Sequence, residues 1–462
     1  MKGVTSHCSK VFASTSAVLL VCTAASCMRL EPSVFDTSQN TEALAASLAI
    51  GWRVATPAFN PAAAYYSSAQ TISITTATTG AKIYFTDDGS LPSSSATLYS
   101  TPFHIWSAAG KTIQAIGTKS GMPDSSVASG VFGYSTLKTG QALCYDQVGT
   151  VISCAGTKQD GELQLGVARS FTGPAAHAIY TSDYTTTDNA TGLVWKSCSQ
   201  GLSGAACATG TAQTLTWANA DSDPTWGCNA LNSANSGNGY AGIKTWRVPT
   251  RMEFETLVDH DASAAPWSFA AAFPATVSSM YWTSTAYQPS ATKVWTLNFF
   301  TGFFGGNLKT NAYNVRCISG SPANPTYNYT DNGDGTIKDN GSGLIWQKCS
   351  MGQNNDTTCS GAATTATLTP AMTYCNSLGL AGKSWRLPNI QELKTLIDTT
   401  TSASVKINGT AFPSTPAISN YHSSTTWNPA AGTSNWQIYL GDGIVDSSGK
   451  TNAYNVRCVS GP

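Results

Sequence analysis

One short stretch of sequence occurs twice and organises the chain from residue 138 onward. Lys244–Asp259 reads KTWRVPTRMEFETLVD, and Lys383–Asp398 reads KSWRLPNIQELKTLID. In each copy a residue suited to cap a helix, Thr250 or Asn389, has a glutamate three positions later, which is the pattern of a capping box. Apolar residues then recur at helical spacing and predict a face turned to a core: Phe254, Leu257 and Val258, and Leu393, Leu396 and Ile397.

Matching landmarks flank both copies of this helix. TGLVWKSC (Thr191–Cys198) and SGLIWQKC (Ser342–Cys349) lie upstream, and TNAYNVRC lies downstream at Thr310–Cys317 and Thr451–Cys458. The landmarks are about 140–150 residues apart, which is too long for a solenoid unit and suits a whole domain. The sequence therefore predicts two related domains: residues 138–320 and 327–462.

A further helix is expected before the twin motif in each copy. In the first copy Thr216 is the candidate cap, and Asp223-Pro224 interrupts the helix. In the second copy Thr369 is the candidate cap, and Pro370 would occupy the first helical position, which proline favours.

The composition favours an exported, β-rich protein. Only 11% of the 462 residues are charged, and the formal net charge is zero. The chain has no run of basic residues, so nucleic acid is not an expected partner. Its many threonine, tyrosine and tryptophan residues are typical of strands.

The N-terminus has the features of an export signal. Val11–Thr23 is a short apolar run that follows two lysines, and small residues precede Cys27. This arrangement resembles a bacterial lipoprotein signal, which implies cleavage of residues 1–26 and lipid on Cys27; ordinary secretion is the alternative. Residues 27–52 would then form a tether. The expected location is the cell envelope, on the outer membrane or cell surface, with the membrane as a partner through the lipid.

Residues 53–134 are predicted to form one small β-domain. Thr71–Thr75 (TISIT) and Lys82–Thr86 (KIYFT) alternate apolar and polar residues, and Asp87–Ser90 has the composition of a turn. The phrases IYFTDDGSLP, LYSTPFHI and KTIQAIGTKSGMPDSS resemble the chitobiase/β-hexosaminidase C-terminal domain, which implies an immunoglobulin-like sandwich. The resemblance does not imply hydrolysis, because no catalytic barrel of ~250 residues accompanies the domain.

The two long copies resemble a second family. The motifs (T/S)GL(V/I)W, WR(V/L)P-x-x-x-E and YNVRC(I/V)SG, with a cysteine in the first helix, are similar to the signature of the Lcl C-terminal domain. That domain is named after a collagen-like bacterial adhesin that binds sulphated glycans, and its members are often exported. The resemblance implies a C-type-lectin-like fold of two helices and a twisted mixed sheet. The expected fold class is mostly β with α+β: one immunoglobulin-like β-sandwich followed by two C-type-lectin-like α+β domains.

The cysteines support export and predict five disulfides. Of 13 cysteines, Cys8 and Cys22 leave with the signal and Cys27 carries the lipid, which leaves an even number. Each copy has a close pair after its TGLVW or SGLIW strand and a distant pair that joins the first helix to the last strand. Repeated domains should repeat their connectivity, and the distant pair also matches the disulfide that the lectin-like resemblance implies. The predicted pairs are Cys144–Cys154, Cys198–Cys207, Cys228–Cys317, Cys349–Cys359 and Cys375–Cys458.

No cofactor, metal or enzyme activity is predicted. The cysteines and histidines lack zinc spacing, and the five histidines suggest no catalytic order. DNGDGT (Asp331–Thr336) resembles the start of a calcium loop, but its glycine comes too early and no glutamate closes it, so a β-turn is favoured over calcium. Arg247 and Arg386 are expected to bind backbone carbonyls or the capping glutamate. His422 is expected to replace Trp282 in a half-buried strand.

Aromatic residues late in each copy are the candidate ligand-binding residues. They crowd around glycine-rich stretches, where aromatic rings stack on sugars or anchor protein partners. Sheet core is the alternative for at least half of them. Phe303-Phe304-Gly305-Gly306 is the loop that we expect to be most exposed. The candidates are Trp282, Phe303, Phe304, Trp427 and Trp436.

These features together predict a non-catalytic, lipid-anchored cell-envelope protein. We expect it to act as a surface module that binds a glycan or a host or matrix protein. Two alternatives stay open: a structural envelope protein without a soluble ligand, and a degenerate enzyme on the fold of the formylglycine-generating enzymes.

Overall fold

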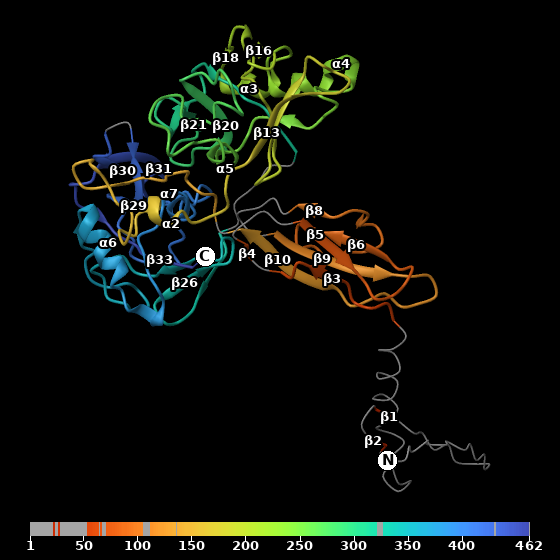
Figure 1. Ribbon diagram of the computed structural model, residues 1–462, viewed down its shortest axis with the longest axis horizontal. Coiled ribbons are helices and arrows are strands. Elements are labelled where there is room, and N and C mark those ends of the chain that lie inside the picture. Colours follow the sequence, from red (N-terminus) through yellow and green to blue (C-terminus); the bar gives the residue numbers. More distant parts are fainter. Residues whose placement is uncertain are drawn as a thin grey trace.

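The computed structural model describes residues 53–461, apart from residues 64, 67–70, 105–110, 135, 321–326 and 429–430. It also describes the backbone of two short paired strands: β1 (Cys22–Thr23) and β2 (Ser26–Cys27). The predicted signal peptide, the tether and the Cys27 side chain otherwise lie outside the described residues. The described chain is mostly β and is arranged in several sheets (Figure 1).

The N-terminal domain is a sandwich of two sheets, with the strand orders β4-β10-β9-β6-β7 and β3-β5-β8. Apolar residues alternate with polar ones along the strands, so one face of each sheet supplies the core, where Ile72, Ile83 and Phe132 are buried. The TISIT and KIYFT stretches are strands with the predicted bounds. The strands are β3 (Ala58–Asn60), β4 (Tyr65–Tyr66), β5 (Thr71–Thr75), β6 (Lys82–Thr86), β7 (Thr97–Leu98), β8 (Phe103–His104), β9 (Lys111–Thr118) and β10 (Ala128–Tyr134).

Each long copy has a small sheet that joins its beginning to its end. The orders are β13-β14-β15-β24-β19 in the first copy and β25-β26-β27-β33 in the second. In both, the strand with the TGLVW or SGLIW motif pairs with the last strand of the copy, which brings the two ends of the copy together. The strands are β13 (Phe171–Ala176), β14 (Tyr184–Asp188), β15 (Val194–Lys196), β19 (Trp246–Arg247), β24 (Ile318–Ser319), β25 (Tyr329–Asp331), β26 (Thr336–Asp339), β27 (Ile345–Gln347) and β33 (Val459–Ser460).

The helices are short, and the twin motif forms one in each copy. Both capping boxes are present, with Thr250 accepting from the Glu253 N–H and Asn389 accepting from the Glu392 N–H, so this prediction is confirmed. The first helix of the second copy starts two residues earlier than predicted, because Thr367 is its N-cap and Pro370 is its third residue. The helices are α3 (Trp217–Ser222), the 3-10 turn η2 (Cys228–Ser233), α4 (Ala234–Gly237), α5 (Arg251–Glu255), α6 (Leu368–Asn376), η3 (Leu380–Gly382) and α7 (Ile390–Lys394).

The largest sheet runs through both copies. Its order is β18-β23-β20-β21-β22-β31-β30-β29-β32-β28, in which the second half repeats the first half in reverse. The copies are therefore related by a pseudo-two-fold axis between β22 and β31, where Phe304 pairs with its own counterpart, Val445. The strands are β18 (Thr214–Leu215), β20 (Met280–Ala286), β21 (Lys293–Asn298), β22 (Phe303–Leu308), β23 (Tyr313–Asn314), β28 (Thr365–Ala366), β29 (Asn420–Trp427), β30 (Ser434–Tyr439), β31 (Ile444–Gly449) and β32 (Tyr454–Asn455); a separate hairpin pairs β16 (Leu202–Ser203) with β17 (Thr209–Gly210).

This strand pairing exchanges side chains between the two cores. Phe303 packs into the core of the second copy, where its ring lies 5.8 Å from Trp427 and 5.5 Å from Trp436. Its counterpart, Ile444, packs into the core of the first copy. Trp267 of the first copy also stacks on Trp427, with the ring centroids 6.0 Å apart. Each copy therefore completes part of the core of the other.

Residues 138–166 form a closed loop, called the strap below, that lies on the second copy. The ends of the strap meet where Leu137 bridges Val167. Between them come the strands β11 (Cys144–Tyr145) and β12 (Val151–Ile152) and the helix α2 (Asp160–Leu163). Figure 1 shows the yellow α2 among the blue elements of the second copy, where it contacts β29. The strap falls within the predicted first domain, 138–320, but its contacts join it to the second.

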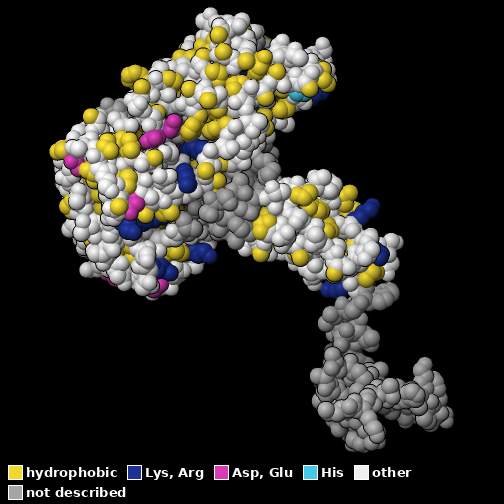
Figure 2. Space-filling view, viewed as in Figure 1, with side chains coloured by type: hydrophobic (Ala, Val, Ile, Leu, Met, Phe, Trp, Pro, Cys, Tyr) yellow, Lys and Arg dark blue, Asp and Glu magenta, His cyan; other side chains and the backbone are white. Residues whose placement is uncertain are grey.

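Charged side chains are sparse on the surface. Figure 2 shows a face made mostly of uncharged polar and hydrophobic atoms, with a few scattered basic and acidic groups. None of the helices in the described part of the chain has the length and apolar character that crossing a bilayer requires.

Candidate binding surfaces

The aromatic residues predicted to contact ligand lie inside the protein. Trp282, Phe304 and Trp436 are at most 1% exposed. Phe303 and Trp427 are partly buried against the core of the second copy. The prediction of an exposed loop at Phe303 is wrong, because Phe303 begins a strand whose edge pairs with β31. Trp282 packs in the core of the first copy, whereas Phe303, Trp427 and Trp436 pack together where the copies meet, so the core alternative describes these rings.

A buried ion pair stands at the start of the twin helix in each copy. The fully buried Glu392 accepts hydrogen bonds at 2.5 Å from both terminal nitrogens of Arg386 and also accepts from the backbone N–H of Asn389. Glu253 accepts from the terminal nitrogens of Arg247 at 2.8 and 2.6 Å. The prediction that these arginines bind the capping glutamate is confirmed.

Beside this ion pair, one strand of each copy bulges. The register of β20 against β21 shifts between Trp282 and Ala286, and the register of β29 against β30 shifts between His422 and Thr426. The other edge of β20 pairs with β23 only at the beginning of the strand, at Tyr281, and the other edge of β29 pairs with β32 only at Tyr421. Ala286 and Thr426 therefore present backbone groups at equivalent sheet edges.

In the second copy the strap fills this edge. The side-chain amide of Gln141 donates to the Thr426 carbonyl at 2.9 Å and accepts from the Thr426 N–H at 2.8 Å, as a neighbouring strand would. The Tyr145 hydroxyl reaches the Asn428 side chain at 3.2 Å. These contacts satisfy backbone groups that would otherwise lack partners at a sheet edge.

The strap also buries charged groups against the second copy. Asp160 accepts hydrogen bonds at 2.7 Å from the hydroxyls of Thr139 and Thr425. Burial raises the pKa of Asp160 to about 6, because the two hydroxyls offset only part of the cost of removing the carboxylate from water. Lys450 donates to the Asp146 carbonyl at 3.1 Å, and burial lowers the pKa of Lys450 to about 8.

The corresponding edge of the first copy, called the open edge below, faces solvent. Ser284 and Ala286 are exposed, whereas their counterparts Ser424 and Thr426 are 2% and 0% exposed. Lys309, the lysine of this edge, is half-buried, whereas its counterpart Lys450 is fully buried under the strap. The described part of the chain thus covers one of two equivalent surfaces and leaves the other accessible.

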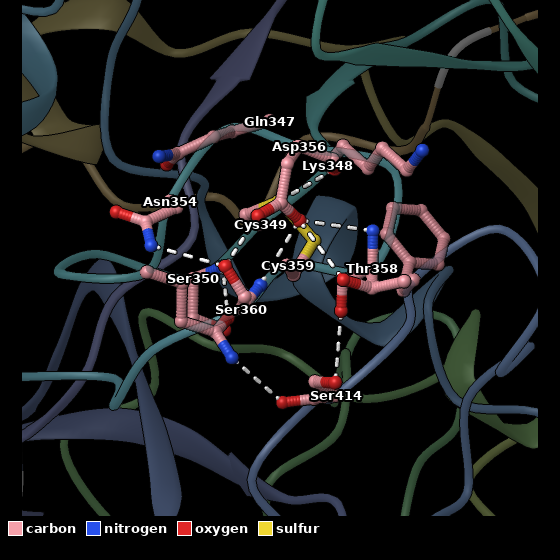
Figure 3. Close-up of a disulfide and its surroundings, with 12 residues drawn as sticks. Gln347, Lys348, Cys349, Ser350, Asn354, Asp356, Thr358, Cys359, Ser360 and Ser414 are labelled. Carbon is pink, nitrogen blue, oxygen red and sulfur yellow. Dashed lines mark hydrogen bonds between the residues drawn. A yellow bond between two sulfur atoms is a disulfide. The ribbon is translucent and has the colours of Figure 1, made fainter.

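A second candidate surface is the disulfide-closed loop of each copy. In the second copy the Cys349–Cys359 bridge encloses a polar loop with the exposed amide of Asn354. Asp356 orders this loop by accepting hydrogen bonds from Thr358 and Ser360 (Figure 3). These bonds, that of the Ser360 hydroxyl foremost, lower the pKa of Asp356 to about 2. The loop therefore holds a fixed carboxylate and an exposed amide at the surface.

Buried cations fix the base of both disulfide loops. Arg457 is fully buried and donates to the Gln347 carbonyl at 2.9 Å, and its counterpart Arg316 donates to the Ser197 carbonyl. The ammonium of Lys196 donates to three carbonyls of the first loop, and burial lowers the pKa of Lys196 to about 7. Arg316 and Arg457 were not among the predicted sites, although both occupy the same position in the repeated motif, directly before the last cysteine of each copy.

The buried histidines have structural partners. His422 lies fully buried in β29, more deeply than expected, with Nε2 2.9 Å from the Ala366 carbonyl. His260 lies at the junction of the copies, with Nε2 3.4 Å from the ammonium of Lys394. Burial and the charge of Lys394 lower the pKa of His260 well below its usual value, which keeps the ring neutral.

The acidic stretch that opens the second copy is a hairpin turn, as predicted. The strands β25 and β26 pair on either side of it, and Asp334 accepts from the N–H and hydroxyl of Thr336. Asp331 forms an ion pair with Lys348 at 2.8 Å. Across the residues that the structure describes, no group of three or more histidine, cysteine, aspartate and glutamate side chains is placed to hold a metal.

The disulfides join the cysteines in the pairs that the repeat predicts. The long bridge of the second copy ties its first helix, α6, to the residue before its last strand. The long bridge of the first copy starts from η2, the 3-10 turn after the first helix, and ends at the residue before β24; the short bridges close surface loops. The bridges are Cys144–Cys154, Cys198–Cys207, Cys228–Cys317, Cys349–Cys359 and Cys375–Cys458.

Comparison with protein-family models accounts for both kinds of domain. The model of the Lcl C-terminal domain matches residues 184–319 and 335–460, which together make up more than half of the chain. The chain belongs to the Lcl C-terminal domain family. The chitobiase/beta-hexosaminidase C-terminal domain matches residues 61–129, within the N-terminal sandwich. No curated protein matches the chain. Both Lcl C-terminal matches exclude the strap, which is therefore an addition to the matched domains.

Proposed function

We propose that this Lcl C-terminal protein is a lipid-anchored module of the cell envelope that binds a glycan or a host or matrix protein without catalysis. Its domain content, two Lcl C-terminal domains and one immunoglobulin-like domain, is that of a surface adhesin-like module. The single observation that carries the proposal is the fusion of the two Lcl C-terminal domains through one ten-stranded sheet. A fused pair of domains holds the surface loops of both copies on one rigid support.

The chemistry of the surface supports a neutral, polar ligand. Hydroxyl and amide side chains dominate the disulfide-closed loop of the second copy, and such groups suit the hydroxyls of a sugar. The loop is held in place by its disulfide and by Arg457 at its base, so little ordering would accompany binding. Sparse surface charge fits recognition by hydrogen bonds and apolar contacts more than by charge.

A glycan and matrix-protein array tests the proposal. The chain with Cys27→Ser, purified without its signal, should bind a restricted set of array members. Replacing Asn354 and Asn355 with alanine should abolish or weaken binding to glycans, whereas the exposed Asn238→Ala in the first copy serves as the matched control. Variants of Phe303 are unsuited to this test, because they damage the junction between the copies.

Two outcomes would overturn the proposal. If no array member binds above the level of an unrelated exported protein, a structural envelope protein becomes the better description. If the purified chain turns over any tested substrate, the alternative of an enzyme on this fold returns.

A further inference from the structure

We infer that the open edge of the first copy binds a partner protein through a loop with the chemistry of the strap, a side-chain amide combined with a carboxylate. The inference rests on the proposed binding function and names the class of partner for one surface. Its basis is that the same surface of the second copy is already occupied, so the contacts of such a complex can be read from the strap.

The amide contact depends on backbone atoms alone. Gln141 binds the N–H and the carbonyl of Thr426 and makes no use of the threonine side chain. Ala286 holds the same register against its neighbour, paired with Val294 as Thr426 is paired with Asn435. The open edge therefore offers the same donor and acceptor, even though the residue there is alanine.

The carboxylate contact is also preserved in the first copy. The Thr425 hydroxyl accepts from the N–H of Ile390 at 3.0 Å and donates to Asp160. The Thr285 hydroxyl accepts from the N–H of Arg251 at 2.9 Å, which leaves its hydrogen for a carboxylate. Arg247 lies beside this position and its side chain is 18% exposed, against 10% for the counterpart that the strap shields.

A lysine completes the comparison. Lys450 donates to a carbonyl of the strap and lies over the ring of Tyr145, 5.3 Å from its centroid. Lys309 stands at the same position of the first copy, is half-buried and already lies over the ring of Trp217, 4.8 Å from its centroid. In the first copy Trp217 already supplies the aromatic ring, so a partner loop need bring only a carbonyl group to this ammonium, as the strap brings the Asp146 carbonyl to Lys450.

The occupant is expected to come from another protein. The strap of the same chain is held on the second copy by the contacts of Gln141 and Asp160, and its ends are fixed near the first copy. A second copy of the chain would have to release its own strap, which would uncover another edge. An unpaired strand edge beside the Thr285 hydroxyl, which still has a hydrogen to donate, is a ready template for a chain from outside.

A synthetic strap serves as the probe for this surface. A fluorescent peptide of residues 138–166, closed by its Cys144–Cys154 disulfide, is titrated with the mature chain and followed by fluorescence anisotropy. We expect saturable binding that weakens about tenfold when the peptide carries Gln141→Ala, because two hydrogen bonds are lost. In the protein, Ser284→Lys should abolish binding and Lys309→Ala should weaken it, whereas the exposed Lys338→Ala should leave it unchanged.

Three results would overturn the inference. Absence of saturable binding to the folded protein would show that the open edge does not accept this chemistry. Equal binding by wild type and Ser284→Lys would place the peptide elsewhere. Self-association of the chain that Ser284→Lys abolishes would identify the occupant as a second copy.

A negative glycan and matrix array with the peptide binding intact would reject the proposed ligands and leave this inference standing.

Discussion

Glu392 performs two tasks with one buried carboxylate, since it neutralises Arg386 and closes the capping box of α7. Replacing it with alanine should lower the free energy of unfolding by about 3–5 kcal/mol, because a buried guanidinium loses its counter-charge. Urea unfolding of the full chain measures the loss. The matched variant is Glu253→Ala in the first copy, where Arg247 is more exposed and the loss should be smaller. Equal losses below 1 kcal/mol in both variants would contradict the structure.

Asp160 should make the docking of the strap sensitive to pH. Its pKa is raised to about 6 in the folded chain, from about 3.9 for an unfolded aspartate, so the folded state favours the protonated form. The stability that this proton contributes is fully present below about pH 4 and is lost as the pH rises through about 6. By linkage the loss amounts to about 3 kcal/mol, and Asp160→Asn should remove it.

Urea unfolding of both proteins between pH 4 and pH 7 tests this expectation. The stability of wild type should fall relative to Asp160→Asn as the pH rises, and the change should centre between the two pKa values. Parallel profiles would show that Asp160 is ionised in the folded state over this range.

At the scale of elements, the contribution of each disulfide to stability should depend on the length of the loop that it closes. The bridge between Cys375 and Cys458 spans 83 residues, and the bridge between Cys349 and Cys359 spans 10. In the chain-entropy model, the long bridge contributes about 4.5 kcal/mol and the short one about 3 kcal/mol. Alanine at both ends of the long bridge should therefore lower the melting temperature more than alanine at both ends of the short one. The reverse order would indicate that residual structure in the denatured state, and not loop length, decides how much each disulfide stabilises the fold.

Phe303 belongs to the first copy in sequence and to the second copy in packing. Phe303→Ala should destabilise the second copy by about 2–3 kcal/mol, below the range for a fully buried phenylalanine. Hydrogen exchange should accelerate in β30, where Trp436 loses a neighbour. The control is Phe300→Ala, which removes a ring that is 62% exposed and should change stability by less than about 0.5 kcal/mol. Faster exchange confined to the first copy would contradict the exchange of side chains across the junction.

Features fixed by local sequence were predictable in this chain. The capping boxes, the strands at Thr71–Thr75 and Lys82–Thr86, and the disulfide pairs follow from residue pattern or from repetition, and the structure has each of them. The start of α6 was misplaced because proline is tolerated throughout the first turn, where N–H groups lack helical partners. Pro370 therefore marked the region of the helix start but not the residue.

Features that depend on long-range pairing were not predictable. Phe303 and Phe304 have the composition of an exposed aromatic loop when β22 is considered alone, and their burial requires β31, which lies about 140 residues later. The glutamine and aspartate of the strap likewise acquire a role only when Thr425 and Thr426 are placed beside them. No local propensity specifies which edges of a sheet meet.

At the scale of the whole molecule, we propose that attachment to a membrane depends on Cys27. Expression in a diderm host with a fatty-acid analogue should label the wild-type chain and place it in the membrane fraction, because small residues precede Cys27 as in lipoprotein signals. Cys27→Ser should remove the label and release the chain. The control is Cys22→Ser, which alters the other cysteine near the boundary and should leave labelling unchanged. Persistent labelling of Cys27→Ser would reject this anchor.

The position of the strap imposes an order on folding. Gln141 emerges during synthesis long before Thr426, its hydrogen-bonding partner, and β22 emerges before β31. Until the strands of the second copy have been synthesised, the strap has no surface to pack on and the edge of β22 is unpaired, so both can bind other chains. In the export that we propose, the N-terminus would leave first and both surfaces would stay uncovered until the C-terminal copy folds. Folding of the C-terminal copy would then be the step that protects the molecule from aggregation. A chain truncated before β31 should therefore require a periplasmic chaperone to remain soluble.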